Sequence, residues 1–165
     1  ETIAVFSENV QITEEGILVS GEWEVCCRFF TRAKTVTTHW IQKGIDEGAE
    51  LVLDGRNVVV PGYENGFFVG PTILDHVTPE MTVGNREIFG PVTCIKRVKD
   101  YEEGIAVMNA NPFANGSCIF TQSGYYSRKF AMETDGGMVG INVGIPVPTA
   151  YFPFSGNKDS FSGVT

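Results

Sequence analysis

Short runs in which apolar and polar residues alternate dominate the first thirty residues. Polar turns at 7–9 and 14–16 separate these runs. Such alternation is typical of β-strands with one buried face. We therefore predict a β-rich N-terminal segment over residues 1–30, with strands at Thr2–Phe6, Val10–Thr13, Ile17–Ser20 and Glu22–Cys26.

The hydrophobic spacing changes to that of a helix between residues 31 and 48. Apolar residues recur there at intervals that place them on one face of an α-helix. These residues are Val36, Trp40, Ile41 and Ile45. Gly48 follows as a residue that readily takes the left-handed backbone of a helix C-cap. The pattern predicts one helix that ends at Gly48.

Two short strands are predicted after this helix, at Leu51–Leu53 and Val58–Val60. The dipeptide Asp54-Gly55 between them is typical of a tight turn. A further extended segment is expected over Gly70–Leu74.

Strands and helices alternate from residue 92 onward. We predict strands at Val92–Val98, Gly116–Thr121 and Met138–Val143. Asp100 and Ser123 are N-cap residues of the two intervening helices, and Glu103 completes a capping box with Asp100. Short strand–helix–strand connections imply parallel strands in one sheet, so the expected fold class is α/β. The tail from Gly144 is predicted to be an irregular loop.

Composition narrows the class of protein. The chain has 165 residues, a hydrophobic fraction of 42% and a net charge of -8, which suits a globular domain rather than a disordered chain. The acidic excess argues against nucleic acid as a partner, because phosphate binding needs clustered Lys and Arg. No apolar stretch approaches the roughly 20 residues that cross a bilayer, so no membrane partner is expected.

The four cysteines give no sign of a metal site. Cys26, Cys27, Cys94 and Cys118 lack the pairing and the neighbouring histidines that bind zinc. We expect reduced thiols in an intracellular protein, and no metal ion.

A series of motifs in the second half of the chain resembles the NAD(P)-dependent aldehyde dehydrogenase superfamily. The first motif, Arg86–Pro91, stands directly before a predicted strand; alone it would be a turn with a solvated glutamate. The later motifs keep the family's order and spacing, and they are Asn111–Gly116, Ile119–Thr121, Gly140–Asn142 and Pro153–Gly156. The resemblance implies that residues 31–165 are the C-terminal portion of an aldehyde dehydrogenase catalytic domain, and that residues 1–30 are unlike the family.

Other segments are similar to the CoA-acylating methylmalonate-semialdehyde dehydrogenase branch of this superfamily. They are Leu53–Arg56, Val58–Asn65, Phe68–Ile73 and Ile145–Pro148. The resemblance implies NAD as cofactor, a small-molecule semialdehyde as substrate and coenzyme A as co-substrate, with loss of carbon dioxide. It also implies that the intact enzyme is a homo-oligomer, in the cytoplasm or the mitochondrial matrix.

Two cofactor-binding residues follow from the match to the family. Glu87 stands where the family's glutamate binds the ribose hydroxyls of the nicotinamide half of NAD, and two carboxylate oxygens suit a vicinal diol. Phe89 stands where the family places an aromatic ring near the nicotinamide. The alternative for Phe89 is a buried core position.

Two substrate-pocket residues are implied in the same way. Asn142 matches a family asparagine near the active site, and a structural hydrogen-bonding role is equally open. Phe154 lies where the family builds the wall of its substrate entrance, as does the loop Ile145–Pro148. Plain packing is the alternative for both.

The catalytic nucleophile is expected outside this chain. The family attacks the aldehyde with a cysteine thiolate that lies well upstream of the glutamate, and Cys26 and Cys27 stand too close to Glu87. The nucleotide-binding domain is also missing. We therefore expect no catalysis by this chain alone, and a non-catalytic remnant or interaction module is the competing interpretation. Uncovered strand edges predict self-association, or a strand from residues 1–30 that covers the edge.

Overall fold

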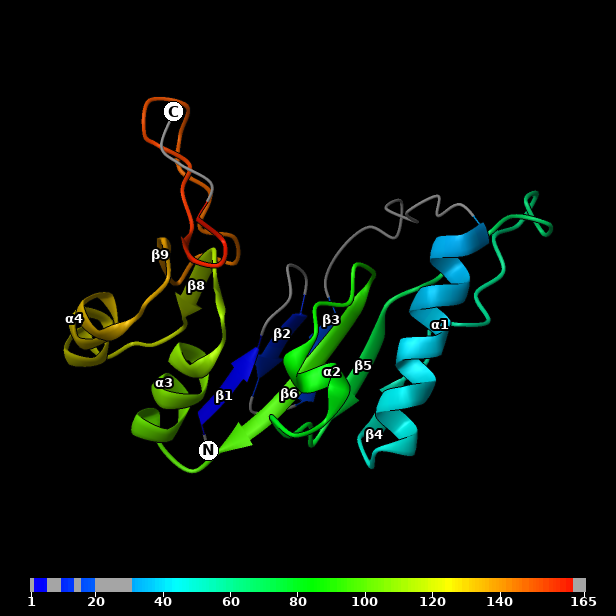
Figure 1. Cartoon of the computed structure of the whole chain (residues 1–165), viewed down its shortest axis with the longest axis horizontal. Helices are drawn as coiled ribbons and strands as arrows, with labels where there is room; N and C mark the ends of the chain where they lie inside the picture. Colours follow the sequence, from blue (N-terminus) through cyan, green and yellow to red (C-terminus); the bar gives the residue numbers. More distant parts are fainter. Residues whose placement is uncertain (1, 6–9, 14–15, 20–30, 162–165) are drawn as a thin grey trace. The chain divides into compact units, whose positions relative to one another are not determined.

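The computed structural model describes residues 2–5, 10–13, 16–19 and 31–161. The chain divides into two compact units (Figure 1). The N-terminal unit holds residues 3–97, and the C-terminal unit holds residues 98–165 together with residues 1–2. The strand predicted at Glu22–Cys26 lies outside the described residues.

A four-stranded sheet is the main element of the N-terminal unit. Its strands stand in the order β1–β6–β5–β4, and their bounds are Thr2–Val5 for β1, Val92–Val98 for β6, Thr72–Asp75 for β5 and Glu50–Leu53 for β4. β5 and β6 run parallel, with Thr72 opposite Val92, whereas β4 pairs antiparallel with β5.

The N-terminal segment supplies the edge of this sheet. β1 lies beside β6, which confirms the expectation that a strand from residues 1–30 covers the edge. β2 (Val10–Thr13) and β3 (Gly16–Val19) pair with each other as an antiparallel hairpin. Three of the four strands predicted in this segment are therefore present.

Helix α1 spans Thr31–Asp46 and packs on β5. It ends as predicted: Gly48 has a φ of +106° and donates its N–H to the carbonyl of Ile45 at 3.0 Å. The buried face is rotated relative to the prediction, because Val36 is 47% exposed while Thr37 and Ile41 are buried.

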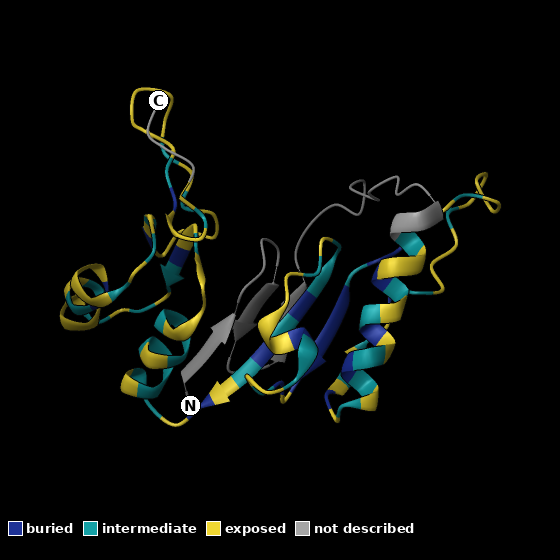
Figure 2. Ribbon diagram, viewed as in Figure 1, coloured by how far each residue is buried: buried dark blue, intermediate teal, exposed yellow. Residues whose placement is uncertain are grey.

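Gly44 continues the buried face of α1. A Cβ atom at this position would stand 2.9 Å from Leu74 Cδ1 and 3.1 Å from Val83 Cγ2, so the helix can approach β5 this closely only without a side chain. Leu74 is fully buried, and all four residues of β5 are buried (Figure 2). The core of this unit therefore lies between α1 and the middle of the sheet.

The strand predicted at Val58–Val60 is absent, and this prediction was wrong. Val58 and Val59 are exposed. The Asp54 carboxylate instead accepts hydrogen bonds from the Arg56 backbone N–H at 3.0 Å and from the Arg56 guanidinium at 2.6 Å, which closes a local turn. Within the described part of the chain, Val58–Val60 pairs with no strand.

The C-terminal unit contains two helices and two small sheets. α3 (Tyr101–Ala110) and α4 (Gly124–Glu133) start at the predicted N-caps: Asp100 Oδ1 accepts the Glu103 N–H at 2.9 Å, and Ser123 Oγ accepts the Tyr126 N–H at 3.4 Å. β8 (Gly116–Ile119) runs parallel to β9 (Met138–Ile141). β7 (Phe113–Ala114) pairs antiparallel with β10 (Asn157–Lys158), which the sequence did not predict.

The prediction of parallel strands is confirmed, but the prediction of one sheet is wrong. β6 belongs to the four-stranded sheet, whereas β8 and β9 form a sheet of their own. In the sheet order β6 stands between β1 and β5, and β8 pairs with β9. Among the described residues, no helix has the length and apolar character needed to cross a membrane.

Candidate functional site

The loop Arg86–Pro91 carries both residues expected to bind the cofactor. It connects α2 (Thr82–Asn85) to β6. Ile88 packs against the hydrophobic core, whereas Glu87 is exposed and Phe89 is 82% exposed. The alternative of a buried core position for Phe89 is therefore wrong, because it is Ile88 that enters the core.

Backbone hydrogen bonds fix the shape of this loop around Phe89. Gly90 donates its N–H to the carbonyl of Ile88, and Val92 donates to the carbonyl of Gly90, each at 2.8 Å. Pro91 contributes its carbonyl to the Thr72 N–H, also at 2.8 Å, which ties the loop to the start of β5. Because Ile88 packs against the core on one side and Gly90 is hydrogen-bonded on the other, Phe89 has a fixed backbone and a free side chain.

The chemistry of Glu87 and Phe89 fits one end of a dinucleotide. The carboxylate of Glu87 makes no hydrogen bond or ion pair within the described part of the chain. Its two oxygens can accept from the two vicinal hydroxyls of a ribose. Phe89 offers an apolar ring face two residues away, which suits a planar heterocycle. This loop could therefore hold the nicotinamide–ribose half of NAD.

Asn142 has a structural role in the C-terminal unit. Its Oδ1 accepts the Thr121 N–H at 2.8 Å, and its Nδ2 donates to the Thr121 carbonyl at 3.0 Å. Its own N–H donates to the Ile119 carbonyl at 2.8 Å, and its φ is +56°. Asparagine tolerates this left-handed backbone better than most residues. Asn142 thus joins the ends of β8 and β9, and any role toward a substrate stays a prediction.

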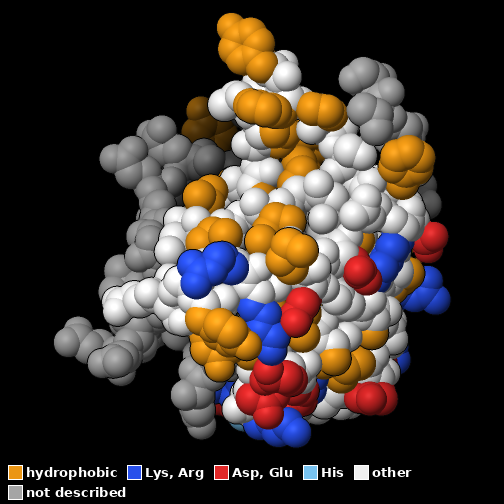
Figure 3. Space-filling view, turned by 90° about the vertical axis from the view of Figure 1, so that its left-hand side faces the viewer, with side chains coloured by type: hydrophobic (Ala, Val, Ile, Leu, Met, Phe, Trp, Pro, Cys, Tyr) orange, Lys and Arg blue, Asp and Glu red, His pale blue; other side chains and the backbone are white. Residues whose placement is uncertain are grey.

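Phe154 belongs to an apolar tail that follows β9. Figure 3 shows hydrophobic side chains gathered over the upper part of one face, where this tail lies. The exposed large apolar residues of the tail are Val143, Ile145, Val147, Tyr151, Phe152, Phe154 and Phe161. Pro146 anchors the loop Ile145–Pro148, because a Cβ at Gly116 would stand 2.9 Å from Pro146 Cγ. The tail therefore offers an apolar surface, and the role of Phe154 in a substrate wall stays a prediction.

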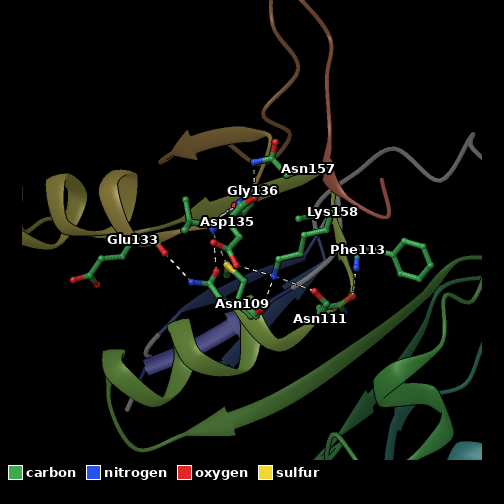
Figure 4. A network of polar contacts seen from close by, with 12 residues as sticks. Asn109, Asn111, Phe113, Glu133, Asp135, Gly136, Asn157 and Lys158 are labelled. Carbon is green, nitrogen blue, oxygen red and sulfur yellow. Dashed lines mark hydrogen bonds and ion pairs between the residues drawn. The ribbon is translucent and has the colours of Figure 1, made fainter. Parts of the chain in front are cut away.

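Lys158 attaches the end of this tail to α3. Its ammonium group forms an ion pair with Asp135 at 2.7 Å and donates to the backbone carbonyls of Asn109 and Asn111 at the end of α3 (Figure 4). A cation at this position suits the negative end of a helix. Asn157 adds a hydrogen bond to the Asp135 carbonyl at 2.8 Å. No pattern of residues indicated this network, since Lys158 lies in a segment predicted to be irregular.

The two cysteines that the structure describes are poor nucleophiles. Cys94 and Cys118 are free thiols. Burial raises the pKa of Cys94 to about 11 and also raises the pKa of Cys118. Both thiols are therefore protonated near neutral pH, whereas the thiolate is the reactive form. Cys26 and Cys27 lie outside the described residues.

The four predicted site residues fall in two groups. Glu87 and Phe89 share one loop of the N-terminal unit, and Asn142 and Phe154 belong to the C-terminal unit. No group of three or more His, Cys, Asp or Glu residues suited to a metal ion is found within the part of the chain that the structure describes.

Comparison with known proteins finds one family. The model of the aldehyde dehydrogenase family matches residues 31–165. The mitochondrial, acylating methylmalonate-semialdehyde dehydrogenase of Arabidopsis thaliana is 52% identical over 132 residues, which is 80% of this chain and 22% of that protein. The chain spans about a quarter of the length of the curated relatives it matches.

Solved structures give the same result. The crystal structure of methylmalonate-semialdehyde dehydrogenase from Oceanimonas doudoroffii matches with a TM-score of 0.78 and 44% identity, over 81% of this chain and 27% of that chain. An aldehyde dehydrogenase from Mycobacterium tuberculosis, solved with NAD+, matches with a TM-score of 0.74 and 32% identity, over 82% of this chain and 27% of that chain.

Proposed function

Because this chain belongs to the aldehyde dehydrogenase family, we propose that it supplies the nicotinamide end of the cofactor site and part of the substrate wall in the NAD-dependent oxidation of a semialdehyde. The observation that carries this proposal is the loop Arg86–Pro91, which holds Glu87 and Phe89 exposed on a fixed backbone. The relatives named methylmalonate- and malonate-semialdehyde dehydrogenases support the substrate class.

On the cofactor side, each residue has one task. Glu87 accepts hydrogen bonds from the two ribose hydroxyls, which fixes the sugar, and Phe89 limits the movement of the nicotinamide ring. NAD, when bound, takes up a hydride from the carbon that is oxidised. Hydride transfer depends on close and well-oriented reacting atoms, so both residues contribute by positioning.

On the substrate side, Phe154 and its neighbours in the tail form an apolar wall, and Asn142 holds the strand ends from which the tail starts. The cysteine nucleophile comes from sequence outside this chain, which agrees with the raised pKa values of Cys94 and Cys118. Coenzyme A as acyl acceptor is supported by the acylating relative. We also propose that the intact enzyme is a homo-oligomer in the cytoplasm or the mitochondrial matrix. One relative is described as mitochondrial.

A non-catalytic interaction module is the second candidate. The observation in its favour is the exposed apolar tail, because contiguous apolar surface is typical of a face that another protein covers. The two candidate functions differ in the role of Glu87. The cofactor site requires its carboxylate, whereas the interaction module does not.

Steady-state kinetics separate the two candidates. This chain is joined to the remaining N-terminal sequence of the Arabidopsis relative and assayed with a semialdehyde acid, with and without coenzyme A. Glu87→Gln should raise the KM for NAD with a smaller effect on the KM for the aldehyde, and Phe89→Ala should lower kcat by up to about 100-fold. An inactive hybrid that is folded, or an unchanged KM for NAD in Glu87→Gln, contradicts the proposal and favours the interaction module.

A further inference from the structure

Helix α2, which precedes the cofactor loop, takes its N-terminal cap from another helix. α2 is a single turn, and its own N-cap residue, Met81, makes no side-chain hydrogen bond to it. The Glu47 carboxylate, located just after α1, fills this place. It accepts the Thr82 N–H at 2.6 Å through Oε2 and the Thr82 hydroxyl at 2.6 Å through Oε1. A one-turn helix has little stability alone, so this contact matters for its position.

The Glu47 side chain is itself held in place. Lys43, one turn earlier, forms an ion pair with Oε1 at 2.9 Å, and the Glu47 side chain is only 23% exposed. The hydrogen bonds from Thr82 and Lys43 lower the pKa of Glu47 to about 2. The carboxylate is therefore ionised at neutral pH, in the form that accepts both bonds.

The contacts between α1 and the segment 82–90 follow one face of the helix. Glu47 contacts Thr82, Gly44 contacts Val83, and Thr37 contacts Gly90. Intervals of three and seven residues along α1 return to the same helical face. The segment therefore runs antiparallel to α1 and is fixed to it at both ends, with Glu87 and Phe89 between these two attachments.

We propose that Glu47 is a positioning residue for the cofactor loop, acting through Thr82 and α2. This inference rests on the proposed function of Glu87 and Phe89, and Glu47 itself does not contact the cofactor. Loss of the cap releases the start of the segment while Gly90 still holds its end. The loop then samples more conformations, and binding of the nicotinamide half weakens because ordering the loop adds to its cost.

Hydrogen–deuterium exchange on the full chain tests the first step without any cofactor. Glu47→Ala and Thr82→Val, which removes the hydroxyl at nearly constant shape, should speed exchange in residues 82–91 by about fivefold, the effect expected for losing one helix cap. Thr82→Ser keeps the donor and should restore wild-type exchange. Glu102→Gln, which removes a carboxylate bound to Lys129 at 2.6 Å in the C-terminal unit, is the matched control and should leave this segment unchanged.

Titration with NAD, followed by NMR at the amides of residues 86–90, tests the second step. Glu47→Ala and Thr82→Val should weaken the response severalfold, with Thr82→Ser near wild type. If exchange of residues 82–91 is unchanged in Glu47→Ala and Thr82→Val, the positioning role is overturned. The same holds if exchange rises but wild type and variants bind NAD equally. If wild type gives no response to NAD, the proposed function fails, and the exchange data still decide whether Glu47 fixes the loop.

Discussion

The backbone of Gly90 lies directly against the buried side chain of Thr37. A Cβ atom at residue 90 would stand 2.8 Å from both Oγ1 and Cγ2 of this threonine. Thr37 is only 1% exposed and belongs to α1, so it cannot easily move away. This contact links the helix to the loop that carries Glu87 and Phe89.

Gly90→Ala should therefore destabilise the chain. Overpacking of this kind costs about 1–3 kcal/mol, and urea unfolding measures it. Gly144→Ala is the matched control, because a Cβ there meets no atom within 4 Å. Equal stability of the two variants would show that the loop can shift away from α1.

The ion pair and hydrogen bonds of Glu47 predict an unusual response to acid. Its pKa is lowered from 4.5 to about 2, chiefly by the hydrogen bond from Thr82. A lowered pKa stabilises the folded state above the ordinary value, and this stabilisation is lost as the pH falls from about 4.5 toward 2. The NMR shift of the Thr82 amide should titrate near the lower value, and Glu47→Gln should abolish this titration. A midpoint near 4.5 would disprove the cap.

Cys94 should react slowly with iodoacetamide at neutral pH. A pKa of about 11 in place of 9.0 leaves about a hundredfold less thiolate. Alkylation is followed at each cysteine by mass spectrometry. Cys118 should be modified before Cys94, because burial raises the pKa of the Cys118 thiol less. Denaturation should remove the difference. Fast labelling of native Cys94 would reopen the question of a nucleophile within this chain.

Asn142 should matter for stability. Asn142→Ala removes both side-chain bonds to Thr121 and leaves alanine in a left-handed backbone, which should cost roughly 1–2 kcal/mol. Asn115→Ala is the control, since the Asn115 side chain makes no hydrogen bond among the described residues. Denaturant unfolding compares the two variants. An equal free energy of unfolding would show that Asn142 has no structural role.

Local signals in the sequence predicted most elements correctly. Asp100 and Ser123 marked two helix starts, Gly48 marked a helix end, and the apolar run at Val92–Val98 is a strand with the same bounds. Each depends on chemistry within a few neighbouring residues, which periodicity and capping rules describe well.

Contacts between distant segments were not predicted. The buried face of α1 includes Thr37 and Gly44, which hydrophobicity alone does not identify as buried. The failure at Val58–Val60 has the same origin, since β-branched residues favour a strand only where a partner strand is available. Glu47 and Lys158 were missed because a charged residue gives no sign of the backbone that it caps.

The family resemblance located Glu87 and Phe89, and the structure adds how they are held. Exposure of Phe89 could not be read from the sequence, because Ile88 and Phe89 are both apolar and either could enter the core. The hydrogen bond from Gly90 to Ile88 and the contact with Thr37 decide between them.

Titration of the full chain with NAD, followed by NMR at each backbone amide, tests the central claim most directly. The account predicts a saturable response confined to residues 86–90, with a dissociation constant in the millimolar range, because one diol contact and one ring face hold only half of a flexible ligand. Glu87→Gln should weaken this response by about tenfold or more, as expected for loss of a hydrogen bond to a charged group. A micromolar constant, a response elsewhere in the chain, or the same affinity in Glu87→Gln would contradict the assignment of this loop to the cofactor.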